Sequence, residues 1–122
     1  MSTRLPFIDA FLAGDSAAAV ALLAPDATFN SPVRTYRGAE QIAPLWAAID
    51  GIIDGQHTTG MLEGERESAA FFAGSVDGAP IDGVLRVRAR DDGAVTDVTL
   101  MLRPYASLKA AVGEMARRLA AA

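Results

Sequence analysis

The chain has no cysteine and only one histidine, and this scarcity excludes several kinds of chemistry. Without cysteine, the protein can form no disulfide, carry no thiol nucleophile and bind no metal through thiolates. The single histidine, His57, has no second histidine or glutamate at ligand spacing, so we expect no metal site. A glycine-rich phosphate loop, an HExxH helix and an EF-hand loop are also missing, so we expect no cofactor.

Positive charge is in the minority as well. The chain has 11 Lys and Arg residues and 15 Asp and Glu residues, which gives a net charge of −4. Nucleic-acid-binding proteins need clustered Lys and Arg to displace counterions, so we expect no nucleic-acid partner. Arg4, Pro6 and Asp9 interrupt the apolar residues at the start, where a signal peptide would continue, and no apolar run is long enough to span a membrane. We therefore expect no membrane partner and a cytoplasmic location.

Hydrophobic residues make up 51% and charged residues 21% of the 122 positions, which is typical of a folded globular protein. This length fits one domain, over residues 1–122, that can bury a core or enclose one small cavity. We expect a first helix over residues 2–14, where Gly14 ends it. Asp15 can then cap a second helix, which ends at residue 24 because Pro25 prevents its continuation.

A short strand is expected over residues 27–31, and Gly38 then opens a third helix. The apolar residues of this helix fall at i, i+3, i+4 and i+7: Ile42, Leu45, Trp46 and Ile49. Pro44 lies inside the pattern, so either the helix begins later than Gly38 or it kinks at the proline.

From Gly55 onward the pattern changes to extended segments separated by turn-forming residues, which indicates an antiparallel meander. Pro104 ends the last of these segments, and an apolar stripe predicts a closing helix over residues 105–119. Helices first, then a meander, then a helix is the order of an α+β fold and not of an alternating parallel one.

The register of the last hairpin decides which residues face inward. We predict a two-residue type I′ turn at Asp92-Gly93, because it separates the faces. The apolar residues then share one face: Leu85, Val87, Ala89, Val98, Leu100 and Leu102. The polar residues share the other: Arg86, Arg88, Arg90, Asp97 and Thr99. The alternative, a three-residue turn that includes Asp91, would mix charge into both faces.

The stretch Ala-Pro-Asp-Ala-Thr-Phe-Asn-Ser-Pro-Val at residues 24–33 follows an alanine-rich helical hairpin broken at Gly14-Asp15 and precedes Tyr-Arg-Gly-Ala-Glu-Gln-Ile at residues 36–42. This order resembles the nuclear transport factor two-like superfamily, which includes ketosteroid isomerases, limonene-epoxide hydrolases and SnoaL-like cyclases. The resemblance runs nearly end to end. It implies a cone-shaped α+β fold, with a curved antiparallel-rich sheet wrapped by N-terminal helices and an additional C-terminal helix. Because one fold hosts many chemistries, function has to be argued from the site.

The resemblance also implies where catalytic residues would lie, and this chain departs from the pattern. The hydroxyl donor on the first helix of the isomerases corresponds to Phe7, and their catalytic aspartate corresponds to Ser31, which cannot replace a carboxylate base unaided. Their protonated aspartic acid corresponds to Leu85 when counted back from the last turn. A rival alignment assigns that role to Asp82, which we expect in or near a turn. The acidic residue of the hydrolases and cyclases corresponds to Leu100.

In such folds the concave face of the sheet and the first helices enclose a pocket. We predict a largely apolar pocket lined by Phe7, Phe11, Phe29, Ser31, Trp46, Leu85, Val87, Val98 and Leu100. Catalytic residues are not assigned, and the remaining candidates are His57, Tyr36 and Asp82. A structural or solvent-facing role is favoured for His57, since a lone histidine near neutral pH is not by itself a catalytic site. Ser31 is expected to cap the turn at Pro32.

These observations favour a small-molecule-binding protein that takes an apolar or ring-shaped ligand and lacks the usual catalytic acids of its superfamily. The alternative is an isomerase, cyclase or hydrolase acting on a hydrophobic ring-containing molecule. A third hypothesis is a protein-interaction module. The resemblance further implies a homodimer that forms through the outer face of the sheet, with Thr99 and Met101 at its seam.

Overall fold

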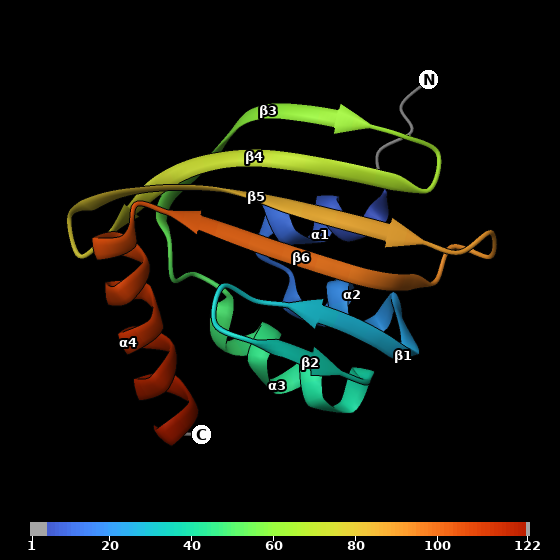
Figure 1. The fold of residues 1–122 in the computed structure, drawn as a ribbon, viewed down its shortest axis with the longest axis horizontal. Coiled ribbons are helices and arrows are strands. Elements are labelled where there is room, and N and C mark those ends of the chain that lie inside the picture. Colours follow the sequence, from blue (N-terminus) through green and yellow to red (C-terminus); the bar gives the residue numbers. More distant parts are fainter. Residues whose placement is uncertain (1–4, 122) are drawn as a thin grey trace.

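The computed structural model describes residues 5–121, which form one curved sheet and a set of helices (Figure 1). The strands have the order β2-β1-β6-β5-β4-β3, and neighbours are antiparallel except β1 and β6, which run parallel. In chain order the elements are α1 (Pro6–Ala13), α2 (Ser16–Ala21), β1 (Leu23–Asn30), β2 (Thr35–Arg37), α3 (Ala39–Ile49), β3 (Asp54–Glu63), β4 (Glu67–Val76), β5 (Ala79–Ala89), β6 (Val95–Arg103) and α4 (Tyr105–Ala121). This arrangement confirms the expected α+β plan with an additional C-terminal helix.

The first two helices form the hairpin that their glycine and aspartate predict. Gly14 ends α1 with a φ of 70°, a left-handed conformation that glycine adopts without strain. The Asp15 carboxylate accepts a hydrogen bond from the backbone N–H of Ala18 at 3.0 Å and so caps α2. Residues 2–4, where the first helix was expected to begin, lie outside the described residues.

The second helix is shorter than the sequence predicts. It ends at Ala21 and not at residue 24, because Leu23 already pairs with Val95 of β6. The register between β1 and β6 shifts between Leu23 and Thr28, and Pro25, which has no N–H to donate, lies in that irregular stretch. The predicted strand is therefore the regular part of a longer one.

Helix α3 begins at Ala39 with Pro44 inside it, so the alternative of a later start is wrong. The proline removes one backbone donor, but it lies on the exposed side of the helix. Ile42 and Trp46 lie on the opposite side and are buried against the sheet, which is the face that the helical spacing predicts.

The register of the last hairpin is as predicted over most of its length. Leu85 pairs with Leu100, and Val87 pairs with Val98, so these apolar side chains share one face and are buried. This is the face that the N-terminal helices cover, and we call it the concave face.

The turn itself is not the predicted type. The backbone N–H of Gly93 donates to the carbonyl of Arg90 at 2.9 Å, and only Gly93 in this turn has a positive φ, so the loop has three residues. Thr96 restores the register as a bulge, because Arg88 pairs with Asp97 while the next residue pairs with Val95.

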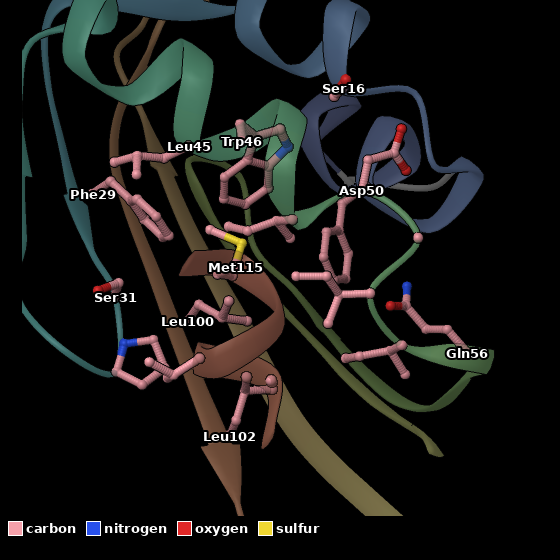
Figure 2. Close-up of a pocket in the computed structure, with 18 of the residues that line it drawn as sticks. Ser16, Phe29, Ser31, Leu45, Trp46, Asp50, Gln56, Leu100, Leu102 and Met115 are labelled. Atoms are coloured by element: carbon pink, nitrogen blue, oxygen red, sulfur yellow. The ribbon is translucent and has the colours of Figure 1, made fainter. Parts of the chain in front are cut away.

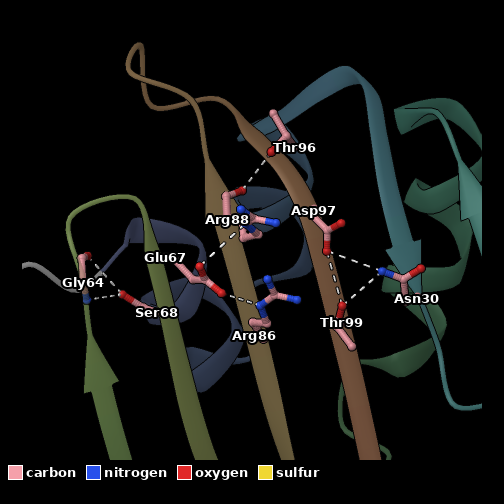
Figure 3. Close-up of polar contacts among 9 residues, drawn as sticks. All are labelled: Asn30, Gly64, Glu67, Ser68, Arg86, Arg88, Thr96, Asp97 and Thr99. Atoms are coloured by element: carbon pink, nitrogen blue, oxygen red, sulfur yellow. Dashed lines mark hydrogen bonds and ion pairs between the residues drawn. The ribbon is translucent and has the colours of Figure 1, made fainter.

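The outer face of the sheet carries the charged and polar side chains (Figure 3). Glu67 of β4 forms ion pairs with Arg86 and Arg88 of β5, with nitrogen–oxygen distances of 2.5 and 3.7 Å. The side-chain amide of Asn30 donates to the Thr99 hydroxyl at 3.1 Å, across the parallel strand pair. The predicted separation of apolar and charged faces is confirmed.

Candidate functional site

A cavity of about 240 Å³ lies between the concave face and helices α1, α3 and α4 (Figure 2). Its floor is formed by Phe72 of β4 and by Leu100 and Leu102 of β6. Helix α4 covers it with the residues that point back toward the sheet: Leu108, Ala111, Val112, Met115, Ala116 and Leu119. The site therefore occupies the end of the concave face where β6 leads into α4.

Helix α4 covers this end of the sheet only loosely. Ala111 is buried, but it is small, and Val112 and Leu119 remain 37% and 38% exposed. A helix that presents alanine to a curved sheet leaves space that larger side chains would fill. This explains why the cavity opens beneath α4, while α1 and α2 border it only with Ala10, Phe11 and Ser16.

Aromatic rings form the wall between the cavity and the rest of the core. Trp46 of α3 lies 5.2 Å from Phe29 and 6.0 Å from Phe11, measured between ring centroids. Phe11 lies 5.2 Å from Phe72 in the same way. Tilted and edge-on pairs at these distances pack favourably, so the wall is a fixed apolar surface.

At one end of the cavity the polar groups are occupied by the protein itself. The Ser31 hydroxyl donates to the carbonyl of Arg34 at 2.8 Å and accepts from the N–H of Arg34 at 3.0 Å. This confirms that Ser31 caps the turn at Pro32. Tyr36 borders the same end, with its ring stacked on Phe29.

At the other end, four polar side chains border the cavity: Asp15, Ser16, Asp50 and Gln56. Asp50 follows the last residue of α3, and Gly51 after it has a φ of 74°, so the chain turns there toward β3. Sequence reasoning missed Asp50. Its only local signal is that of an Asp-Gly pair after a helix, which indicates a turn and says nothing of a pocket.

The sequence-predicted lining residues divide into two sets. The set that borders the cavity consists of Phe11, Phe29, Ser31, Trp46 and Leu100. The set that belongs to the solid core, and does not border the cavity, consists of Phe7, Leu85, Val87 and Val98. The second set lies where α1 and α2 pack directly on the sheet, and periodicity cannot distinguish a core face from a cavity wall.

The candidates for catalysis are scattered. Tyr36 borders the cavity, whereas His57 is exposed on β3, with Nδ1 3.0 Å from the carbonyl oxygen of Gly55. Asp82 lies within β5, so the expectation of a turn is wrong: strands β4 and β5 continue past it to the turn at residues 77–78. It forms an ion pair with Arg103 at 3.2 Å and does not border the cavity.

The side chains with clearly shifted pKa values do not border the cavity either. Hydrogen bonds from the backbone N–H of Ala94 and from Arg90 lower the pKa of Asp92. A hydrogen bond from Arg117 lowers the pKa of Glu114. Among residues 5–121, no group of three or more histidine or acidic side chains could hold a metal ion. Within the same residues, no helix is long and apolar enough to cross a membrane.

The profile of the SnoaL-like domain family matches residues 6–98, most of the chain. The protein belongs to this family. The resemblance to the nuclear transport factor two-like superfamily is thereby confirmed, and no curated protein matches the sequence significantly.

Solved structures of similar SnoaL-like architecture include a steroid delta-isomerase from Pseudomonas aeruginosa, with 28% identity, a TM-score of 0.86, and 94% of this chain and 87% of that one covered. The chain is also similar to an uncharacterized protein with a cystatin-like fold from Silicibacter pomeroyi DSS-3, with 24% identity, a TM-score of 0.83 and coverage of 95% and 86%. A third similar structure is a hypothetical protein with a ketosteroid isomerase-like fold from Catenulispora acidiphila DSM 44928, in complex with trimethylamine, with 22% identity, a TM-score of 0.62 and coverage of 90% and 95%.

Proposed function

We propose that this chain, as a single SnoaL-like domain over residues 1–122, binds a small and largely apolar organic molecule in the cavity beneath α4. The observation that carries the proposal is the lining, which is aromatic and aliphatic along its length and polar only at its two ends. Ligand pockets generally have this composition, with a few polar groups that orient the ligand.

The size of the cavity limits the ligand. Its volume of about 240 Å³ is below the range of about 300–1,000 Å³ that is usual for pockets of drug-sized ligands. We therefore propose a ligand of one or two rings, for which the aromatic wall of Phe11, Phe29 and Trp46 provides flat contact surfaces.

Blocking the cavity tests this proposal. The probes are toluene, indole and 2-naphthol, and binding is followed by chemical-shift changes in NMR spectra of the labelled protein. We expect wild type to bind at least one probe, and Leu100→Trp, which fills the cavity from its floor, to weaken that binding by about tenfold or more. The matched control is Leu62→Trp on β3, because Leu62 is 64% exposed and does not border the cavity.

Two results would contradict a ligand-binding role in the cavity. One is wild-type protein that binds none of the three probes. The other is Leu100→Trp protein that unfolds cooperatively and binds them as wild type does, since the probes would then occupy a different place.

The second candidate is an isomerase, cyclase or hydrolase, and similarity to the steroid delta-isomerase is its support. The positions at which the resemblance would place the base and the oxyanion donors of the isomerases are Ser31, Phe7 and Leu85, and none of these residues is a carboxylic acid. A steroid has four fused rings, which is more than the one or two rings proposed for the ligand of this cavity. Among the catalytic candidates, Tyr36 borders the cavity. We expect no isomerisation of 5-androstene-3,17-dione in an ultraviolet assay, and turnover that Tyr36→Phe abolishes would favour this second function.

We also propose a homodimer formed through the outer face of the sheet. Phe71 and Met101 are 40% and 54% exposed on β4 and β6, which is more apolar surface than a solvated face of a sheet needs. Sedimentation equilibrium measures the mass directly, and a monomer at micromolar concentration would refute this part of the proposal alone.

A further inference from the structure

The charged side chains that border the cavity are both acidic. They are Asp15 and Asp50, and the described lining residues include no lysine, arginine or histidine. Figure 2 shows Asp50 and Ser16 at the same end of the cavity, where the turn between α1 and α2 meets the end of α3. A cavity that is apolar along its length and negative at one end complements a molecule with an apolar body and a positive head.

No described cation forms an ion pair with the Asp50 carboxylate. The ion pairs among the described residues do not include it. Arg118 of α4 approaches Asp50, but its guanidinium donates to the backbone carbonyls of Ala48 and Asp50, at 3.1 and 2.5 Å, and pairs with Glu114 at 3.5 Å. The half-buried carboxylate is therefore available to a cation from outside the chain.

Local structure keeps the carboxylate uncovered. A Cβ added at Gly14 would lie 3.1 Å from Asp50 Oδ1, a closer approach than almost any real side chain makes. Gly14 also has a φ of 70°, so the residue that ends α1 without strain is also the one whose missing side chain leaves room for this oxygen. Asp15 adds negative charge nearby, although its own carboxylate caps α2.

A second group at this end also lacks a partner. Trp46 borders the cavity and is 3% exposed as a whole residue, and its indole N–H donates to no other described residue. In Figure 2 the nitrogen lies on the edge of the ring nearer Asp50. The indole N–H is therefore free to donate to water or to a polar group of a ligand. The end of the cavity at Ser31 differs, since the Ser31 hydroxyl is already hydrogen-bonded to the backbone of Arg34.

We propose that the ligand is an amine whose protonated nitrogen pairs with Asp50 while its apolar body lies along Trp46, Phe11 and Leu100. This inference rests on the proposed ligand-binding role and names the chemical class of the ligand. An oxygen next to the amine would accept the hydrogen bond that Trp46 offers. Charge-assisted hydrogen bonds to a carboxylate are about twice as strong as neutral ones, so Asp50 discriminates between ligands by charge.

Three probes of similar shape and different charge test the proposal: benzylamine, ethylbenzene and phenylacetate. Affinities are measured by NMR titration at pH 7 and low ionic strength, where benzylamine is protonated. We expect benzylamine to bind about tenfold or more tightly than phenylacetate. Asp50→Asn should weaken benzylamine about tenfold and leave ethylbenzene within about twofold, and 0.5 M salt should weaken only the charged probe.

The matched control is Asp54→Asn. Asp54 is exposed at the start of β3, close to Asp50 in the chain, and it does not border the cavity. The Asp54→Asn substitution removes the same charge from the protein, so its effect on benzylamine affinity measures the long-range electrostatic field alone. Thermal unfolding of both variants shows that each is folded before its affinities are compared.

The outcomes separate this inference from the ligand-binding role on which it rests. Ethylbenzene binding with a benzylamine affinity that Asp50→Asn does not change overturns the amine and leaves an apolar ligand. An equal loss in Asp50→Asn and Asp54→Asn also overturns it, because the field and not a direct pair would be responsible. If wild type binds none of benzylamine, ethylbenzene and phenylacetate, the amine proposal fails, and the titrations with toluene, indole and 2-naphthol decide the ligand-binding role separately.

Discussion

The two ends of the concave face have the same strands and different interiors. Toward the turn at residues 91–93, Leu85, Val87 and Val98 are fully buried beneath the N-terminal helices. Toward α4, Leu100 and Leu102 of β6 border a cavity of about 240 Å³ together with Phe72 of β4. Strand composition does not explain the difference, because both ends carry leucines and other apolar residues on this face.

What differs is the element above the sheet. At the packed end, Phe7 and Ile8 of α1 are completely buried and fill the space over the strands. At the other end, α4 presents Ala111 and Met115 to the cavity. The helices, and not the sheet, therefore decide where this fold leaves an open space. A core and a pocket can therefore be made from one pattern of alternating strand residues.

The largest expected effect comes from truncating each residue of a cross-strand pair that lies between the packed end of the concave face and the cavity. Leu85 and Leu100 pair directly, but Leu85 is 0% exposed while Leu100 borders the cavity. We expect Leu85→Ala to lower the free energy of unfolding by about 3–5 kcal/mol, because its neighbours surround it on all sides. Leu100→Ala should cost at least about 1 kcal/mol less, since it loses packing on fewer sides.

Urea unfolding measures both values on the same scale. Equal losses at the two positions would show that the cavity collapses around Leu100 in solution. The difference between the ends would then be smaller than the structure indicates.

The second test enlarges a side chain at each end of the concave face and does not truncate it. Val98 is completely buried at the packed end, so Val98→Leu should lower stability by about 1–3 kcal/mol through overpacking. Leu100→Phe adds volume toward the cavity and should stay within about 1 kcal/mol of wild type. Thermal unfolding compares the two, and a larger loss for Leu100→Phe would mean that the space beneath α4 is not available.

The difference between the ends also marks the limit of sequence-based prediction for this chain. The order of elements and the concave residues follow from periodicity and turn residues, and the structure confirms them. The predicted register of Leu85 with Leu100 is also confirmed, although the predicted two-residue turn is wrong: a three-residue loop and the bulge at Thr96 give the same register. Periodicity assigns a residue to a face. It does not say how far the covering helix lies from that face, so Val87 and Leu100 look alike in the sequence and differ in the structure.

Asp50 was missed for a related reason. Its position opposite Gly14 depends on how α3 packs against the turn between α1 and α2, and no local pattern encodes that contact. His57, by contrast, is a candidate by residue type and Asp82 by the rival alignment, and neither criterion says where the side chain lies. Of the three candidates, Tyr36 borders the cavity because it lies on β2 directly opposite Phe29 of β1.

The smallest expected effect is on the melting temperature, from substitutions in the two Asp-Gly turns that lie at the two ends of β5. At the end near α4, Asp77 and Gly78 have φ values of 51° and 79°, a two-residue type I′ turn that costs a non-glycine residue some strain. At the packed end, Asp92 accepts hydrogen bonds from the N–H of Ala94 at 3.0 Å and from Arg90 at 3.2 Å. The same dipeptide therefore serves two different geometries.

We expect glycine to act in opposite directions at these turns. Asp77→Gly should leave the melting temperature unchanged or raise it slightly, whereas Asp92→Gly should lower it by about 1–3 °C at pH 7. Hydrogen bonds lower the pKa of Asp92, so its stabilising contribution is present above the pKa of the unfolded state and is lost as the pH falls through the lower folded value. Melting curves at pH 7 and pH 2.5 should show the deficit of Asp92→Gly shrinking in acid, and a deficit that persists there would assign the effect to backbone flexibility and not to the carboxylate.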